Sequence, residues 1–326
     1  SRHSSRHIYS LMSLEKYKEA ERYSKNLENK NKSNFESNLI LGLSQLKKGN
    51  FNKAKIYFDQ MDQNFEHLMV SDILKITLKS WSEADEKGIA SLENIPDTYN
   101  NFKKIQVTLA HCYFDTPEVN RFFNEILEDK NENYSRYYFF LANFLSNKNE
   151  KTKASKIINL ASNKYPKNLL INQFKTTLNE NKKNFNKFNC RDKNNIIAEI
   201  FYIIANALSV QGNYKLSNFY INLAKYLNPY FFSYNSLLAE NFLILKKYEK
   251  SKTIYRQLSK AGKIYKWHAN RQIALILNQQ NKKEEAISLI TKSYRSFQPD
   301  VYQTLDFANF LKDRKQYDKS IELYSS

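Results

Sequence analysis

Few residues of this chain have the types and spacing that catalysis or metal binding requires. His111 and Cys112 are the one adjacent histidine–cysteine pair, but neighbours on a helix point about 100° apart, so we expect no nucleophilic dyad there. His3 and His7 are four residues apart and could share a helix face as metal ligands do, yet no third ligand is nearby. We therefore expect no catalytic residue, no metal and no cofactor in this chain.

The sequence also lacks the motifs of common enzyme classes. It contains no glycine-rich phosphate loop, no paired-carboxylate signature and no serine nucleophile motif. Cys112 and Cys190 are far apart in different parts of the sequence and do not indicate a disulfide framework or a metal site. These observations favour a binding function over catalysis. A binding surface must then be formed by the helices that the sequence predicts.

Residues 198–229, AEIFYIIANALSVQGNYKLSNFYINLAKYLNP, have the pattern of two amphipathic helices joined by a short turn. The first helix carries apolar residues at spacings of three and four: Phe201, Ile204, Ala205 and Leu208. Gly212 is suited to a helix end because glycine accepts a positive φ at little cost. A second apolar pattern runs from Tyr214 to Leu227, and Pro229 closes it because proline cannot continue a helix.

The sizes of the apolar residues in this unit indicate how its helices pack. With Ala198 as position 1, small residues fall at positions 8, 20 and 27, where helices cross closely: Ala205, Ser217 and Ala224. Larger residues fall at positions 4, 11 and 24: Phe201, Leu208 and Ile221. This pattern resembles the tetratricopeptide repeat (TPR) of about 34 residues, with Phe201 where the family has Trp and Leu208 where it has Tyr. The resemblance implies an all-α, right-handed superhelical solenoid of antiparallel helix pairs.

The same register recurs through most of the chain. The residues at position 20 of the last four repeats are Ser217, Ser251, Ala286 and Ser320, which are spaced by 34, 35 and 34 residues. We predict an N-terminal TPR-like solenoid over residues 1–180, with diverged pairs at 69–134. An Asn/Lys-rich loop or hinge follows at 181–197, and a C-terminal TPR solenoid with a truncated last repeat occupies 198–326. We expect the chain to be a piece of a longer protein, because it begins and ends inside repeats.

The resemblance also implies a groove, because the first helices of successive pairs line the concave face of a TPR solenoid. Positions 2, 5 and 9 of each first helix then point into the groove. The predicted groove residues are Phe139, Asn143, Tyr202, Asn206, Glu240, His268, Arg271 and Asn309, and the same positions also hold Arg136, Ser236, Leu275, Tyr302 and Leu305. An asparagine side chain both donates and accepts, so it can hold the backbone of an extended peptide. Composition is the alternative explanation, because the chain has 40 asparagines in 326 residues.

The charge of the chain has two explanations. Lysine and arginine exceed aspartate and glutamate by 51 − 33 = +18, which would suit an anionic partner such as nucleic acid. The lysines are spread over the whole chain, however, and the abundance of Lys, Asn, Ile, Phe and Tyr is also typical of an AT-rich coding sequence. The 23 Tyr and 22 Phe fall mostly on core positions rather than forming a base-stacking platform. No apolar run is long enough to span a membrane.

Together these observations predict a non-catalytic protein–protein interaction scaffold that binds a peptide or partner protein in the groove. The alternatives are the repeat arm of a larger enzyme of the glycosyl- or sulfotransferase type, and a basic solenoid that binds nucleic acid. Residues 197–205 resemble long alphaproteobacterial TPR proteins of unassigned function. That resemblance implies a bacterial protein of the cell envelope or periplasm, with the cytoplasm as the alternative.

Overall fold

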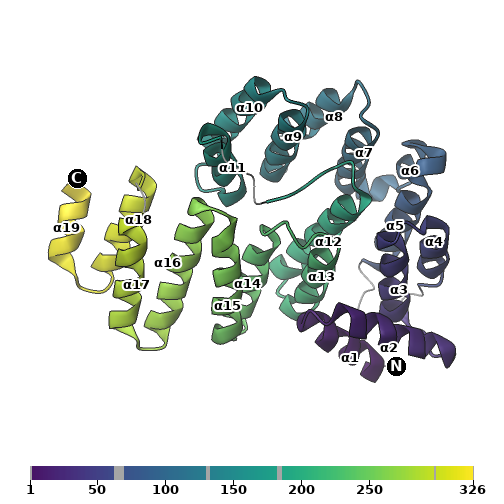
Figure 1. The fold of residues 1–326 in the computed structure, drawn as a ribbon, viewed down its shortest axis with the longest axis horizontal. Coiled ribbons are helices and arrows are strands. Elements are labelled where there is room, and N and C mark those ends of the chain that lie inside the picture. The colour runs from purple at the N-terminus through teal and green to yellow at the C-terminus, as the bar shows by residue number, and fades with distance from the viewer. Residues whose placement is uncertain (1, 62–69, 130–132, 182–185, 297–298, 326) are drawn as a thin grey trace. The chain divides into compact units, whose positions relative to one another are not determined.

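The computed structural model describes residues 2–61, 70–129, 133–181, 186–296 and 299–325, and these residues form helices and no strands (Figure 1). The helices of the first half are α1 (Arg2–Ser13), α2 (Tyr17–Asn29), α3 (Phe35–Lys47), α4 (Phe51–Asp59), α5 (Ser71–Lys87), α6 (Ala90–Glu93), η2 (Asp97–Tyr99), α7 (Asn100–Phe114), α8 (Val119–Leu127) and α9 (Ser135–Asn147). Those of the second half are α10 (Lys151–Lys164), α11 (Leu169–Asn179), α12 (Lys193–Val210), α13 (Tyr214–Leu227), α14 (Tyr234–Ile244), α15 (Tyr248–Leu258), η3 (Ser259–Ala261), α16 (Lys263–Gln279), α17 (Lys283–Arg295), α18 (Val301–Lys312) and α19 (Tyr317–Ser325). Residues 182–185 of the predicted loop lie outside the described residues.

Consecutive helices pack as pairs, and within each unit most pairs that are adjacent in sequence contact one another. The pairs are α1–α2, α3–α4, α5–α6, α7–α8, α9–α10, α12–α13, α14–α15, α16–α17 and α18–α19. The helix α11 is left between two pairs without a partner helix of its own in this series. The prediction of an all-α solenoid of antiparallel helix pairs is confirmed. Among the described residues, no helix has the length and hydropathy needed to cross a membrane.

The turn inside each repeat has the same backbone conformation at position 15. The residue there has a positive φ in seven repeats: Glu15, Gly49, Asn149, Gly212, Lys246, Asn281 and Lys315. A left-handed residue after the last turn of a helix lets the chain reverse while satisfying the terminal carbonyls. Gly49 and Gly212 have φ of 78° and 80°, whereas the other five positions carry residues with a side chain. The local geometry therefore repeats more regularly than the sequence does.

Close packing within a pair explains why small residues recur at positions 8 and 20. The hydroxyl of Ser217, at position 20, donates to the carbonyl of Ala205, at position 8, at 2.7 Å. The equivalent bond joins Ser251 to Ala239, and Ser320 to Ala308. A larger residue at either position would separate the two helices and break this bond. Serine at position 20 thus links the two helices of a pair through a buried hydrogen bond.

The chain divides into two compact units that are not continuous in sequence. The first unit contains Ser1–Ile171 and Lys187–Phe231, and the second contains Asn172–Asn186 and Phe232–Ser326. This division differs from the predicted one, which places a hinge at 181–197 and assigns all later residues to a C-terminal solenoid. The chain leaves the first unit within α11 and returns to it at Lys187, so α12 and α13 belong to the first unit.

Packing against the first three helices places α13 in the first unit. The ring of Phe219 lies 4.5 Å from that of Tyr9, and the ring of Tyr226 lies 5.0 Å from that of Tyr17. Lys47 Nζ donates to the carbonyl of Tyr226 at 2.6 Å. The pair α12–α13 therefore packs against α1, α2 and α3, which are far from it in sequence.

Candidate functional site

Several predicted groove residues are used for packing inside the first unit. Phe139 is fully buried, and its ring lies 5.7 Å from that of Phe231. Arg136 forms a bidentate ion pair with the fully buried carboxylate of Glu199, with a 2.9 Å bond from Nη2 to Oε2. The same guanidinium lies 3.9 Å above the ring of Tyr202. The prediction that Phe139 lines an open groove is wrong, because α9 faces α12 in this unit.

Asn143 holds a backbone segment through its side-chain amide, as predicted, but that backbone belongs to this chain and not to a separate peptide. Its Nδ2 donates to the carbonyl of Phe188 at 2.7 Å, and only 6% of the residue is exposed. The Phe188 side chain is buried, with its ring 4.2 Å from that of Phe140. We refer to residues 187–192, which form an irregular segment ending in a turn at 189–192, as the strap. Asn143 is therefore not available to an external peptide in this structure.

The strap is also held to the end of α13 and the residues that follow it. Asn228 Nδ2 donates to the carbonyl of Lys187 at 3.0 Å, and the Lys187 amide donates to the carbonyl of Tyr230 at 3.1 Å. The predicted loop thus has defined backbone partners at 187 and 188, which the lack of apolar periodicity did not indicate. Two asparagines and one buried aromatic ring fix its path.

A disulfide joins Cys190 of the strap to Cys112 of α7. The two Cα atoms are 5.8 Å apart although the residues are 78 apart in sequence. The expectation that these cysteines form no disulfide is therefore wrong. Its basis was sequence distance, and the strap overcomes that distance by returning the chain to the first unit. With Cys112 oxidised, no thiol is present beside His111, whose Nδ1 lies 2.7 Å from Thr116 Oγ1.

In the second unit, the predicted residues lie on the first helices of successive pairs, α14, α16 and α18. Glu240 is exposed on α14, and partial desolvation raises the pKa of its carboxyl group. Arg271 on α16 is half-buried, with Nη2 3.7 Å from Asp306 Oδ1 on α18. We call this surface, defined by Glu240, His268, Arg271, Tyr302, Leu305 and Asn309, the first-helix face of the second unit.

Three polar atoms near this face have no hydrogen-bond partner among the described residues. They are Tyr255 Oη, His268 Nε2 and Arg271 Nε. The ring of Tyr255 is fully buried and lies 5.9 Å from that of His268, so α15 and α16 bring these groups together. Burial, and then the nearby Glu240 carboxylate, raise the pKa of Tyr255. All three atoms are buried, so they lie beneath the first-helix face and are not part of its accessible surface.

Asn309 on α18 has its side-chain oxygen bound within the second unit. Its Oδ1 accepts from Tyr324 Oη at 2.7 Å and from Lys312 Nζ at 3.4 Å. The oxygen is therefore engaged within the unit, and Nδ2 is the group left to donate to a ligand. Tyr302 and Leu305, which precede it on the same helix face, are 53% and 42% exposed. Asn309 thus has accessible apolar neighbours, whereas Asn143 at the same repeat position is covered.

The protonation of His268 should couple the stability of the second unit to pH. Burial, and then the positive charge of Arg271, lower the pKa of His268 to about 4. The unfolded chain, with a His268 pKa of about 6.5, therefore takes up a proton at a higher pH than the folded chain does. The stability that neutral His268 contributes is complete above pH 6.5 and is lost as the pH falls towards 4. We expect the free energy of unfolding of the second unit to fall by at most about 3 kcal/mol over this range because of His268. The measurement is unfolding in urea, followed by the fluorescence of Trp267.

The matched variant for that measurement is His268→Gln, which keeps a polar side chain without a group that titrates. Its unfolding free energy should change less between pH 6.5 and pH 4 than that of the wild type. Equal changes in the two proteins would show that His268 is not the group responsible.

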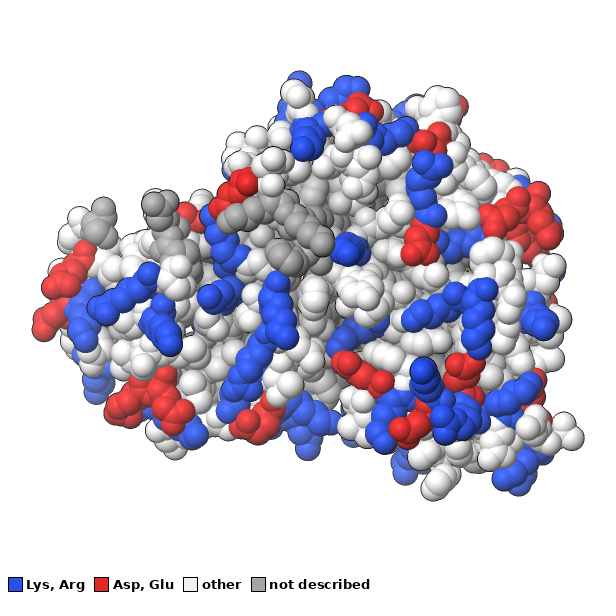
Figure 2. Space-filling model, in the orientation of Figure 1, with Lys and Arg blue, Asp and Glu red and all other residues white. Residues whose placement is uncertain are grey.

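Basic side chains do not form one continuous patch on the face seen in Figure 2. Lysine and arginine are interspersed there with aspartate and glutamate. Many of the lysines form ion pairs, as Lys225 does with Glu15 and Lys263 with Glu180. Asn206, the remaining predicted residue, is exposed on α12 in the first unit. Among the described residues, no cluster of three or more His, Cys, Asp or Glu could hold a metal ion.

The sequence matches no protein-family model, and no curated protein matches it either. The chain is distantly similar to solved helical structures. One is the human IFIT1 dimer with PPP-AAAA, at 14% identity over 94% of this chain and 78% of that chain, with a TM-score of 0.27. Another is Naa15/Naa10 bound to HypK-THB, at 13% identity over 97% of this chain and 56% of that chain, with a TM-score of 0.26.

Proposed function

We propose that this chain is a non-catalytic scaffold that binds a peptide or a partner protein on the first-helix face of the second unit. The observation that carries the proposal is that Tyr302, Leu305 and Asn309 are exposed together on α18, while the side-chain oxygen of Asn309 is already bound within the unit. The fold supports binding because stacked helix pairs present a broad surface, although the same fold serves many roles.

The two units differ in how accessible their predicted residues are. In the first unit, Phe139 and Asn143 are covered by the strap and by Phe231. In the second unit, Tyr302, Leu305 and Asn309 remain exposed beside Arg271. A partner would pair its backbone carbonyls with Asn309 Nδ2 and place apolar side chains against Tyr302 and Leu305. The first-helix face of the second unit is thus the better candidate for an external ligand.

Substituting Arg271→Ala and Asn309→Ala together should weaken binding of the partner by roughly 10- to 100-fold. Each substitution removes a hydrogen-bonding side chain, and such a bond contributes about 0.5–1.5 kcal/mol, or more when charged. The partner would be isolated on the immobilised wild-type chain at moderate salt after nuclease treatment, identified, and titrated by calorimetry. The variant should keep the thermal midpoint of the wild type within a few degrees, because Asn309 is exposed and Arg271 forms only a 3.7 Å contact with the part-exposed Asp306.

The matched control is Asn206→Ala, which removes an exposed asparagine at the same repeat position in the first unit. We expect this variant to bind like the wild type. If the Arg271/Asn309 variant also binds like the wild type, the proposed face is wrong. If a parallel isolation without nuclease retains only nucleic acid, and that nucleic acid is lost as salt rises, the protein is a nucleic-acid-binding solenoid instead.

A further inference from the structure

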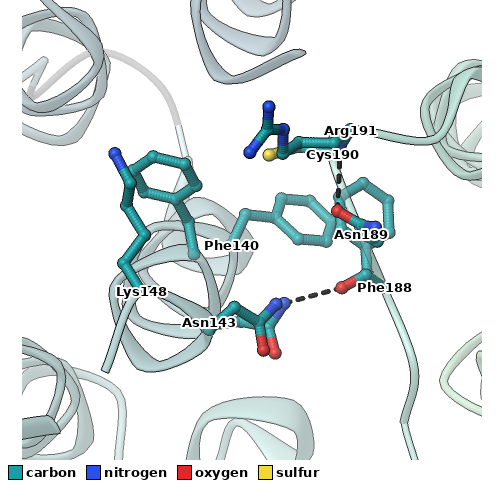
Figure 3. Close-up of a pocket in the computed structure, with 9 residues that line it drawn as sticks. Phe140, Asn143, Lys148, Phe188, Asn189, Cys190 and Arg191 are labelled. Atoms are coloured by element: carbon teal, nitrogen blue, oxygen red, sulfur yellow. Dashed lines mark hydrogen bonds between the residues drawn. The ribbon is translucent and has the colours of Figure 1, made fainter. Parts of the chain in front are cut away.

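The disulfide between Cys112 and Cys190 lies beside a small cavity of the first unit. The cavity has a volume of about 80 Å³ and is lined by residues of α9 and of the strap, among them Phe140, Asn143, Lys148, Phe188, Cys190 and Arg191 (Figure 3). Cys190 contributes to its wall and is 6% exposed, whereas Cys112 does not line it and is fully buried. The thiol end of a small molecule in this cavity would therefore contact Cys190 and not Cys112.

The charges around the cavity favour the binding of an anionic small molecule. Lys148 and Arg191 both line it, and both pair with the same carboxylate. Lys148 Nζ contacts Asp115 Oδ1, and Arg191 Nη1 lies 3.5 Å from Asp115 Oδ2. Two cations and one anion leave a net positive charge at the cavity. Such surroundings attract an anionic thiol and stabilise its thiolate, which is the form that attacks a disulfide.

We propose that Cys190 is a site of thiol–disulfide exchange with a small anionic thiol. The thiolate sulfur of the small molecule attacks Cys190 Sγ and forms a new S–S bond with it. The bond between Cys190 and Cys112 breaks, and its electron pair leaves on Cys112 Sγ, which takes a proton from solvent. The products are a mixed disulfide at Cys190 and a free thiol at Cys112, so the exchange needs no further oxidant or reductant.

Exchange would remove the one covalent bond between the strap and α7. The hydrogen bonds of Asn143 to Phe188 and of Asn228 to Lys187 would remain, together with the buried Phe188 ring. These contacts are non-covalent and each contributes modestly, so the strap would open more often than in the oxidised chain. The exchange is thus a chemical modification that loosens a defined segment.

The test uses the full chain, purified without reductant, and reduced glutathione as the anionic thiol. After incubation, free thiols are alkylated and the chain is mapped by mass spectrometry. We expect untreated protein with no alkylated cysteine, and treated protein with glutathione on Cys190 and the alkyl group on Cys112. Hydrogen exchange at residues 187–192 should rise in the modified protein. Glutathione on Cys112 instead, or two free thiols in untreated protein, would overturn the proposal.

A second comparison separates reaction in the cavity from reaction after unfolding. Cysteamine is a thiol of positive charge, and Lys148→Gln removes one cation from the cavity while leaving the two cysteines in place. We expect glutathione to react about threefold or more slower with this variant, and cysteamine to show no such loss. Equal slowing for both thiols, no dependence on Lys148, or reaction only in urea would contradict exchange at a cation-lined cavity.

Discussion

Replacing Cys112 and Cys190 together by serine should lower the free energy of unfolding of the first unit by about 4 kcal/mol. The disulfide joins residues separated by 78 positions, so it prevents a long segment of the unfolded chain from exploring its conformations. The chain-entropy relation gives about 3 kcal/mol for a loop of 15 residues and about 4.7 kcal/mol for one of 100. A loop of this length falls close to the upper figure.

The two tryptophans allow each unit to be followed separately. Trp81 is fully buried in α5 of the first unit, where its Nε1 donates to Gln106 Oε1 at 2.9 Å, and Trp267 lies in α16 of the second unit. In a Trp267→Phe background, fluorescence in urea reports on the first unit. The serine variant should unfold there at clearly lower urea, as should the parent protein treated with reductant. Identical transitions with and without the disulfide would refute this expectation.

The repeat architecture could be predicted from sequence because its determinants are local. Apolar spacing identifies each helix, and the small residues at positions 8 and 20 identify the crossing within a pair. Ser217 shows the physical basis, because its hydroxyl reaches the carbonyl of Ala205 only when both helices are close. The positive φ at Lys246 and Lys315, by contrast, had no glycine to indicate it. The surrounding repeat imposes that turn.

The division into units could not be predicted, because it depends on contacts between distant parts of the chain. Periodicity shows that α12 and α13 form a pair, but not that the pair packs against α1 and α3. The pairing of Tyr9 with Phe219 and of Tyr17 with Tyr226 joins residues about two hundred positions apart. The same non-local packing brings Cys190 to Cys112. Sequence distance was therefore a poor guide both to the hinge and to the disulfide.

At the candidate site, the hydrogen-bonding role of the asparagine at position 9 could be predicted from the sequence, but its accessibility could not. The asparagine at position 9 was expected to hold the backbone of an extended peptide, and Asn143 does so, but for the strap. Repeat position alone cannot tell whether a groove is filled by the chain that forms it. At Asn309 the equivalent side chain stays exposed, because nothing among the described residues covers α18 on that side. Accessibility, which only the structure gives, decides which of the two can bind an external partner.

Substituting Glu199→Met should destabilise the first unit by about 3–5 kcal/mol, because it removes the carboxylate that forms a bidentate ion pair with the guanidinium of Arg136. The Glu199 side chain is fully buried and that of Arg136 is 15% exposed. The pair joins α9 to α12, so it links the two sequence segments that make up the first unit. The rings of Phe140, Tyr202 and Phe231 lie around the guanidinium.

The matched control is the double variant Arg136→Met/Glu199→Met, in which both charges of this pair are removed. Replacing both members of a buried pair by apolar residues is often close to neutral, so the double variant should recover most of the loss seen in Glu199→Met. The measurement is a double-mutant cycle in urea, again with Trp81 as the probe, and we expect a coupling energy of about 2 kcal/mol or more. A double variant that is as unstable as the sum of the two single variants would show that Arg136 and Glu199 contribute independently. In that case packing, rather than the ion pair, would hold α12 against α9.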